Sequence, residues 1–97
     1  MPTFIITMNW TEQGIRNLKE APKRGAAARE LAKKLGVEIK HTYLTNGESD
    51  FIVIVESPSG DNVAKFCMMA GAQGNVRTRT VRAWSEAEYG KLISELP

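Results

Sequence analysis

The stretch Phe51-Ile52-Val53-Ile54-Val55 constrains the fold most, because five consecutive apolar residues leave no alternation between buried and exposed side chains. Four of the five are β-branched, and such residues favour β-strands. Successive side chains of a strand point to opposite faces of its sheet. The stretch therefore predicts a strand with apolar side chains on both faces, and each face needs a cover.

Strand-forming and helix-forming stretches alternate along the 97 residues. Strands are expected at residues 4–8, continuing toward Asn9 and Trp10, and at 37–45, 50–56 and 75–83. With the helices between them, the order is β-α-β-β-α-β followed by a terminal helix. This order predicts an α+β, ferredoxin-like fold, with a four-stranded antiparallel sheet, strands one and three at its centre and both crossover helices on one face. A single domain over residues 1–97 is expected.

Local signals mark where the helices begin and end. Thr11 is suited to the N-cap of the first helical stretch, Pro22 to a kink within it and Gly36 to its end. Ser85 and Glu88 match a capping box that opens the terminal helix. Apolar residues repeat at helical spacing in three stripes: Ala28, Leu31, Ala32 and Leu35; Val63, Phe66, Cys67 and Ala70; and Tyr89, Leu92, Ile93 and Leu96.

Composition and charge argue against several classes of protein. The 13 Lys and Arg against 11 Asp and Glu give a net charge of +2 without a long basic run, so a nucleic-acid partner is not expected. One Cys and one His show neither disulfide nor metal-ligand spacing, so no metal site is expected. No apolar run is long enough for a membrane span, and no secretion signal opens the chain, so a cytoplasmic protein is expected.

Asn46-Gly47 is a strong signal for a hairpin between the second and third strands. A loop of two or four residues there would place Ile39, His41 and Tyr43 on one face with Asp50, Ile52 and Ile54. Leu44, Phe51, Val53 and Val55 would then face the helices. The opposite face would leave an apolar patch in water, so we expect a homodimer or higher oligomer that packs sheet to sheet, rather than cover by the terminal helix.

Five residues are candidates for ligand binding: Trp10, His41, Tyr43, Asp50 and Arg77. His41 near a Tyr and a carboxylate suits acid–base chemistry, and Arg77 with Arg79 suits an anion clamp. Structural roles compete with each. His41 and Tyr43 suit an interface, Asp50 suits acceptance from backbone N–H groups, and charges on an edge strand discourage aggregation. No catalytic residue or cofactor site is assigned, and whether the protein is an enzyme stays open.

The blocks Asn9-Trp10-Thr11-Glu12-Gln13-Gly14, Gly47-Glu48-Ser49-Asp50 and Gly74-Asn75-Val76-Arg77-Thr78 resemble the GYD domain family of small, mostly bacterial proteins. Gly47 and Asp50 match the family's pattern at the hairpin, whereas Ser49 stands where the pattern has Tyr. The resemblance implies a dimeric α+β barrel, a group that includes ligand-sensing domains, monooxygenases and isomerases.

A homodimeric small-molecule-binding or regulatory domain is therefore the expected function. The alternative is a cofactor-free or haem-dependent monooxygenase or isomerase, with His41 as base or ligand. An RNA-binding module with the same element order is the least expected, because the sheet lacks the paired aromatics and the basic motif of such modules.

Overall fold

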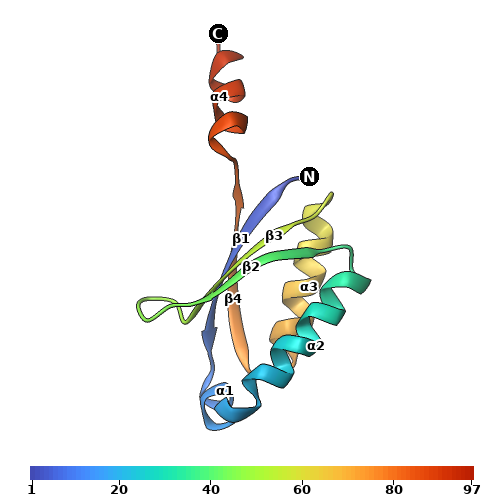
Figure 1. The fold of residues 1–97 in the computed structure, drawn as a ribbon, viewed down its shortest axis with the longest axis vertical. Coiled ribbons are helices and arrows are strands. Elements are labelled where there is room, and N and C mark those ends of the chain that lie inside the picture. Colours follow the sequence, from blue (N-terminus) through green and yellow to red (C-terminus); the bar gives the residue numbers. More distant parts are fainter.

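Four strands form one antiparallel sheet in the computed structural model, which describes residues 1–97 (Figure 1). They are β1 (Thr3–Trp10), β2 (Glu38–Leu44), β3 (Phe51–Glu56) and β4 (Val76–Ala83). Their order across the sheet is β2-β3-β1-β4, so β1 and β3 are central. The α+β, ferredoxin-like architecture that the sequence predicts is confirmed.

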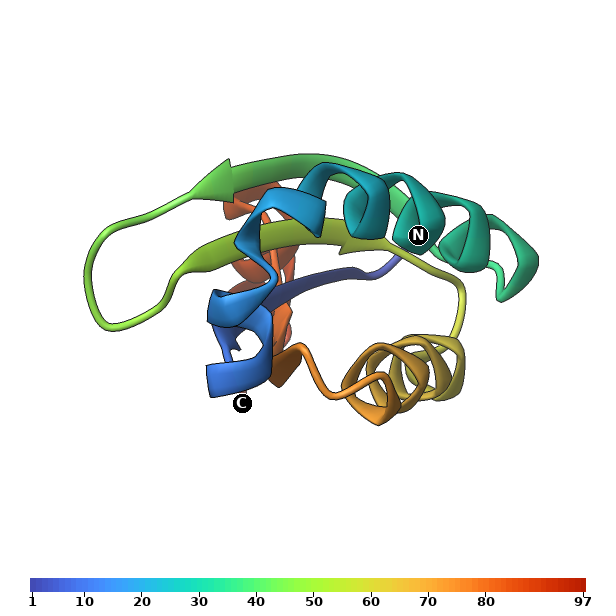
Figure 2. The ribbon, with the colours of Figure 1, turned by 90° about the horizontal axis from the view of Figure 1, so that it is seen from below.

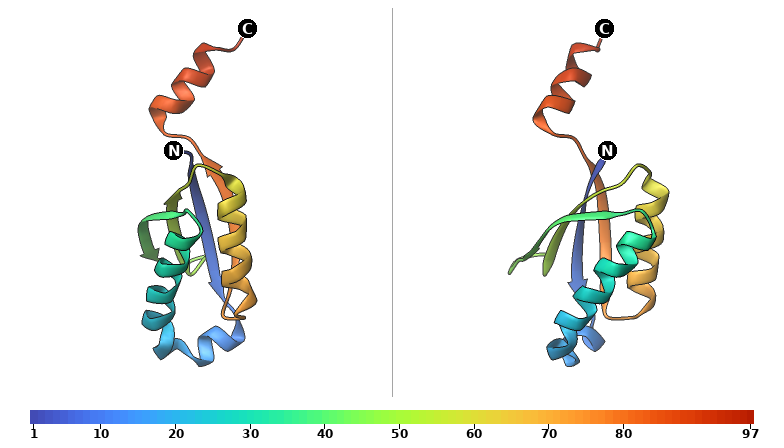
Figure 3. Two further views of the ribbon diagram at one scale, coloured as in Figure 1. Left: turned by 90° about the vertical axis from the view of Figure 1, so that its right-hand side faces the viewer. Right: turned by 45° about the vertical axis from the view of Figure 1, so that its right-hand side comes forward.

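Two long helices, α2 (Ala21–Lys34) and α3 (Gly60–Ala72), lie side by side over the same face of the sheet (Figures 2 and 3). A short helix α1 (Glu12–Arg16) and a 3-10 turn η1 (Leu18–Glu20) connect β1 to α2. The terminal helix α4 (Glu86–Ser94) projects beyond the end of the sheet, away from α2 and α3 (Figure 1). No helix is long and apolar enough to cross a membrane.

The hydrophobic core lies between the sheet and the two long helices. Ile6, Val53 and Val55 from the central strands meet Val63 and Phe66 of α3, and none of these residues is more than 5% exposed. The unbroken apolar stretch of β3 therefore supplies alternate residues to this core. The intervening residues of β3 point to the other face.

Helix boundaries follow the local signals. The Thr11 hydroxyl accepts a hydrogen bond from the Gly14 N–H and caps α1, and Pro22 lies in the first turn of α2. Gly36 has a φ of 72°, a left-handed conformation that ends the helical path after α2. Both hydrogen bonds of the capping box between Ser85 and Glu88 are present at the start of α4.

The expected position of Ile39 is wrong. Ile39 lies opposite Val55 and His41 lies opposite Ile54, so Lys40 is an extra residue in a β-bulge. The bulge moves Ile39 to the helix-covered face, where it packs against the core. A shift of one residue reverses the side chain's face because the repeat of a strand is two residues.

The hairpin expected at Asn46-Gly47 is present, but the expected loop length of two or four residues is wrong. The last strand pair is Leu44 with Phe51, so residues 45–50 form the connection, and Gly47 does not have a positive φ. The Thr45 N–H and hydroxyl donate to the carbonyls of Asp50 and Ser49, at 2.7 and 2.5 Å. Internal hydrogen bonds thus replace a two-residue turn. The connection still has an even number of residues, so the prediction that His41 and Tyr43 share a face with Ile54 and Ile52 is confirmed.

The second face of the sheet is free of helices (Figure 3). We call it the open face. Directly paired residues share a face, so Ile5, Ile52, Ile54 and Val81 lie here together with Tyr43. Tyr43 is 54% exposed and Val81 60% exposed. The terminal helix does not cover this apolar surface, so the apolar stretch of β3 has a cover within the chain on one face only.

Candidate functional site in a cavity between helix α2 and the sheet

A cavity of about 470 Å³ lies between α2 and the sheet, within the size range of small-molecule sites. Its floor comes from the sheet, one wall from α2, and the rest from α3 and the loop before β4. Most lining residues are apolar: Met8, Trp10, Ala21, Pro22, Ala28, Leu31, Ile39, Phe51, Val53, Phe66, Ala70 and Val76. The polar and small ones are Arg24, Gly25, Arg29, Thr42, Gln73 and Asn75.

Small residues on one side of α2 make room for the cavity. Ala21, Gly25 and Ala28 follow one another at spacings of four and three residues, so they lie on one face of the helix, and all three line the cavity. Larger side chains such as Phe51 and Met8 face them from the sheet. Close packing between a helix and a sheet normally fills this space. The absence of bulk on α2 leaves it open.

Trp10 stands at the end of β1 and is oriented by two contacts. Its ring meets Phe51 edge to face, with ring centroids 4.6 Å apart. Its backbone N–H donates to Oδ2 of Asp50 at 2.9 Å. The Asp50 N–H in turn donates to the Met8 carbonyl at 2.9 Å. The joint between β2 and β3 is therefore tied to the part of β1 that lines the cavity.

Helix α1 is bound to the loop before β4 in the same region. Thr11 donates from its hydroxyl to the Gly74 carbonyl at 2.5 Å and from its N–H to the Asn75 carbonyl at 3.0 Å. The Gln13 amide donates to the Gln73 carbonyl and to the Asn75 side chain. Gly74 has a φ of 86°, which favours glycine. These bonds position Gln73 and Asn75, both of which line the cavity.

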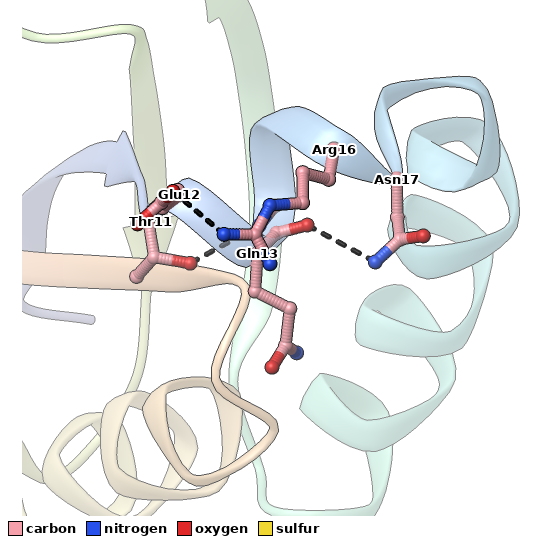
Figure 4. Close-up of polar contacts among 6 residues, drawn as sticks. Thr11, Glu12, Gln13, Arg16 and Asn17 are labelled. Atoms are coloured by element: carbon pink, nitrogen blue, oxygen red, sulfur yellow. Dashed lines mark hydrogen bonds and ion pairs between the residues drawn. The ribbon is translucent and has the colours of Figure 1, made fainter.

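Further bonds hold α1 itself, as Figure 4 shows. Arg16 pairs with Glu12 at 2.6 Å, one helical turn earlier. The Asn17 side-chain amide donates to the Gln13 carbonyl at 3.1 Å, after the last residue of the helix. A five-residue helix has little stability of its own. Caps and contacts with the loop before β4 therefore keep α1 in place.

The two arginines of the cavity have no carboxylate partner. Arg24 donates to the backbone carbonyls of Asn17, at 2.8 Å, and Gly14, at 3.4 Å. Arg29 forms no ion pair, and a β-carbon built at Gly25 would lie 3.7 Å from its Nη1. No acidic residue lines the cavity. The site therefore combines apolar walls with uncompensated positive charge.

The five candidate residues that the sequence suggested lie on two different surfaces of the structure. Trp10 lines the cavity, and Asp50 lies beside it through the Trp10 N–H. His41 and Tyr43 are exposed on the open face, where their rings stack with centroids 6.1 Å apart. Arg77 is also exposed on that face, opposite Asn9. The cavity and the open face are thus two surfaces on opposite sides of the sheet.

Two groups outside the cavity have displaced pKa values. The pKa of Lys40 is raised, chiefly because its ammonium donates to the Glu38 carboxylate at 3.1 Å. The pKa of Glu88 is lowered, chiefly because its carboxylate accepts from the Ser85 backbone N–H at 2.9 Å. Both are exposed, so they report local pairing rather than a catalytic environment. No group of three or more His, Cys, Asp or Glu side chains is arranged to hold a metal ion.

The α2 side of the cavity was not foreseen from the sequence. Residues 24–29 read Arg-Gly-Ala-Ala-Ala-Arg, a run of small residues between two cations. This run was a usable signal, because small residues within a core-facing helix indicate close approach or a void. The apolar stripe of α2 predicts packing against the sheet instead.

A ferredoxin-like α+β domain with a cavity under one helix and an uncovered sheet face is the class that fold and site define. The chain belongs to the GYD domain family, whose model matches residues 4–93. The three sequence blocks that suggested the family meet at one end of the sheet, through the bonds of Asp50 to Trp10 and of Thr11 and Gln13 to residues 73–75.

One relative and two solved structures are similar to this chain. The chain is 32% identical, over 99% of both chains, to the glutamine synthetase and cystathionine beta-lyase binding protein of Thermus thermophilus. A crystal structure of a Thermus thermophilus protein is 17% identical, with a TM-score of 0.61 over 88% of this chain and 95% of that one.

The feast or famine regulatory protein of Mycobacterium tuberculosis, solved with L-methionine, is 16% identical with a TM-score of 0.55. The match covers 89% of this chain and 54% of the regulator, so this chain spans about half the regulator's length. These two structural likenesses concern the fold.

Proposed function

We propose that the protein is a homodimeric regulatory domain that binds a small apolar molecule in the cavity between α2 and the sheet. The observation that carries the proposal is the cavity itself, about 470 Å³ in volume and lined mainly by apolar side chains. Small-molecule sites in proteins are clefts or cavities of about 300 to 1,000 Å³ with mainly apolar linings. The relative from Thermus thermophilus, whose name describes binding to two enzymes, supports a binding role rather than a catalytic one.

The chemistry of the lining also favours binding. No His, Asp, Glu, Cys or Tyr side chain lines the cavity, so it holds no ordinary general base to activate the Thr42 hydroxyl. His41, the base or ligand of the monooxygenase or isomerase alternative, lies on the opposite face of the sheet. Of the candidate residues, Trp10 is the one that we expect to contact the ligand, and Asp50 accepts a hydrogen bond from its backbone N–H.

The homodimer in this proposal forms through the open face. Ile5, Ile52, Ile54 and Val81 make a contiguous apolar surface that soluble monomers rarely leave in water. Packing two sheets face to face would bury it, and would bring His41, Tyr43 and Arg77 into or beside the contact. We place the protein in the cytoplasm and give it neither a nucleic-acid nor a membrane partner.

A cavity-filling variant tests ligand binding. The neutral fluorescent probe N-phenyl-1-naphthylamine is expected to bind the wild-type protein saturably, with one site per subunit. Ala28→Phe places a ring in the cavity and should abolish binding. Ala27→Phe is the matched control, because Ala27 is an exposed neighbour on α2 that does not line the cavity. Equal binding by the two variants, or no saturable binding at all, overturns the cavity proposal.

A charge on the open face tests the dimer. Ile54→Lys should convert the protein to a folded monomer in light scattering, since burying an unpaired ammonium is costly. Ala27→Lys, with the same charge on the exposed side of α2, should remain dimeric. A wild-type monomer, or an Ile54→Lys dimer as tight as the wild type, contradicts this part of the proposal.

A further inference from the structure

We propose that the ligand of the cavity carries a single anionic oxygen group, a carboxylate or a phosphate, which binds Arg29 at the edge of the cavity. The inference deepens the proposed function and rests on it: it concerns the same cavity and names the class of molecule as an apolar body with one oxyanion. The charges around the site are the first support for it.

The acidic residues nearest in sequence are already paired with other cations. Glu12 pairs with Arg16, Glu20 with Lys23 and Glu30 with Lys33. These pairs lie on α1, η1 and α2, and none of their members lines the cavity. Neither Arg24 nor Arg29 belongs to an ion pair. The positive charge at the cavity therefore has no partner within the chain.

The two arginines differ in whether their guanidinium groups already donate hydrogen bonds within the chain. Arg24 uses its guanidinium to bridge the Asn17 and Gly14 carbonyls, which connects α1 and η1 to α2. Arg29 donates no hydrogen bond, so its donors are available. The planar fork of arginine suits the paired oxygens of a carboxylate or phosphate. Arg29 is therefore the group that binds the anion. Arg24 adds positive charge while it connects α1 and η1 to α2.

Gly25 allows Arg29 to reach the cavity. A helical side chain leans toward the N-terminal end of its helix, so Arg29 lies over the turn that contains Gly25. The guanidinium Nη1 would be 3.7 Å from a β-carbon at Gly25, and both residues line the cavity. Ala21 and Pro22 of the first turn of α2 line the same space, so the apolar part of the cavity continues along the helix from Arg29.

The matched pair decanoate and decanol tests the inference by displacement of N-phenyl-1-naphthylamine. In Arg29→Gln, displacement by decanoate should weaken about three- to tenfold, as expected for a partly exposed charged hydrogen bond, while displacement by decanol stays unchanged. Lys34→Gln removes the same charge from the same helix, at a residue that neither lines the cavity nor belongs to an ion pair, and should leave both unchanged. Decyl phosphate in place of decanoate distinguishes the two kinds of anion.

The outcomes separate the two proposals. If the wild type binds the neutral probe but Arg29→Gln does not weaken decanoate or decyl phosphate relative to decanol, the anion inference is overturned and the cavity proposal stands. An equal effect of Lys34→Gln also overturns it, because the effect is then one of overall charge. If the probe does not bind the wild type at all, the proposed function fails and the inference fails with it.

Discussion

Gly14→Ala is expected to destabilise the protein strongly, because the site has no room for a methyl group. A β-carbon at Gly14 would lie 2.2 Å from the Asn75 carbonyl oxygen and 3.2 Å from Cδ1 of Trp10. The first distance is well inside contact range and involves backbone, which cannot rotate away. The same Asn75 carbonyl accepts from the Thr11 N–H at 3.0 Å, so a shift of residue 75 also strains the joint between α1 and β4.

The magnitude follows from three effects. Overpacking a buried site costs about 1 to 3 kcal/mol. Weakening the Thr11–Asn75 hydrogen bond costs about 0.5 to 1.5 kcal/mol. Alanine regains about 0.5 to 1 kcal/mol over glycine within a helix. We therefore expect Gly14→Ala to lower the free energy of unfolding by about 2 kcal/mol, given these ranges.

Urea unfolding at a fixed protein concentration measures the effect, since an oligomer's stability depends on concentration. For a small protein the midpoint should fall by about 1 M at an unchanged slope. Gly25→Ala is the matched control: its β-carbon would meet only Arg29 Nη1, at 3.7 Å, so its midpoint should stay level or rise. A Gly14→Ala midpoint equal to that of Gly25→Ala would refute the packing argument.

The same structure supports three further predictions. Asp50→Ala should lower the free energy of unfolding by about 1 to 3 kcal/mol, because it leaves the Trp10 N–H without its acceptor, and Asp50→Asn should cost less; equal urea midpoints for Asp50→Ala and the wild type would contradict this. The stabilisation that the Glu88 carboxylate gives to the cap of α4 should be fully present above the ordinary pKa of glutamate and lost as the pH falls through the lowered pKa of Glu88. An NMR titration of the Glu88 carboxyl group that gives an ordinary or raised midpoint disproves this. Leu92→Glu should change the unfolding free energy of the monomeric Ile54→Lys protein by less than about 0.5 kcal/mol, since α4 projects into solvent and Leu92 is 47% exposed; a larger loss in urea unfolding would show that α4 packs within the chain.

Features that depend on neighbouring residues in the chain were predictable. The capping box at Ser85 and Glu88, the cap at Thr11 and the left-handed Gly36 are local hydrogen-bond and backbone effects, and all are present. The apolar repeats located α2 and α3, and the element order led to the correct sheet. Within the candidate site, Trp10 and Asp50 were both among the candidate residues, and the hydrogen bond between them was not foreseen.

Features that depend on register or on contacts between distant segments were not predictable. The bulge at Lys40 reversed the face of Ile39, because one extra residue inverts the two-residue repeat of a strand. The cavity arises from small residues of α2 opposite large residues of the sheet, so no single segment reveals it. Likewise, only the structure shows that Trp10 lines the cavity on the helix side of the sheet, away from His41.

The sequence by itself determined the order of elements, the ends of the helices and an apolar strand that needs cover on both faces, since these depend on propensity and periodicity along the chain. Only the tertiary structure decided that α4 leaves the open face uncovered, that Asp50 and the 73–75 loop converge on β1 and α1, and that two arginines without carboxylate partners border a cavity. The physical reason is that packing and charge pairing join residues far apart in sequence, whereas caps and repeats act within a few residues.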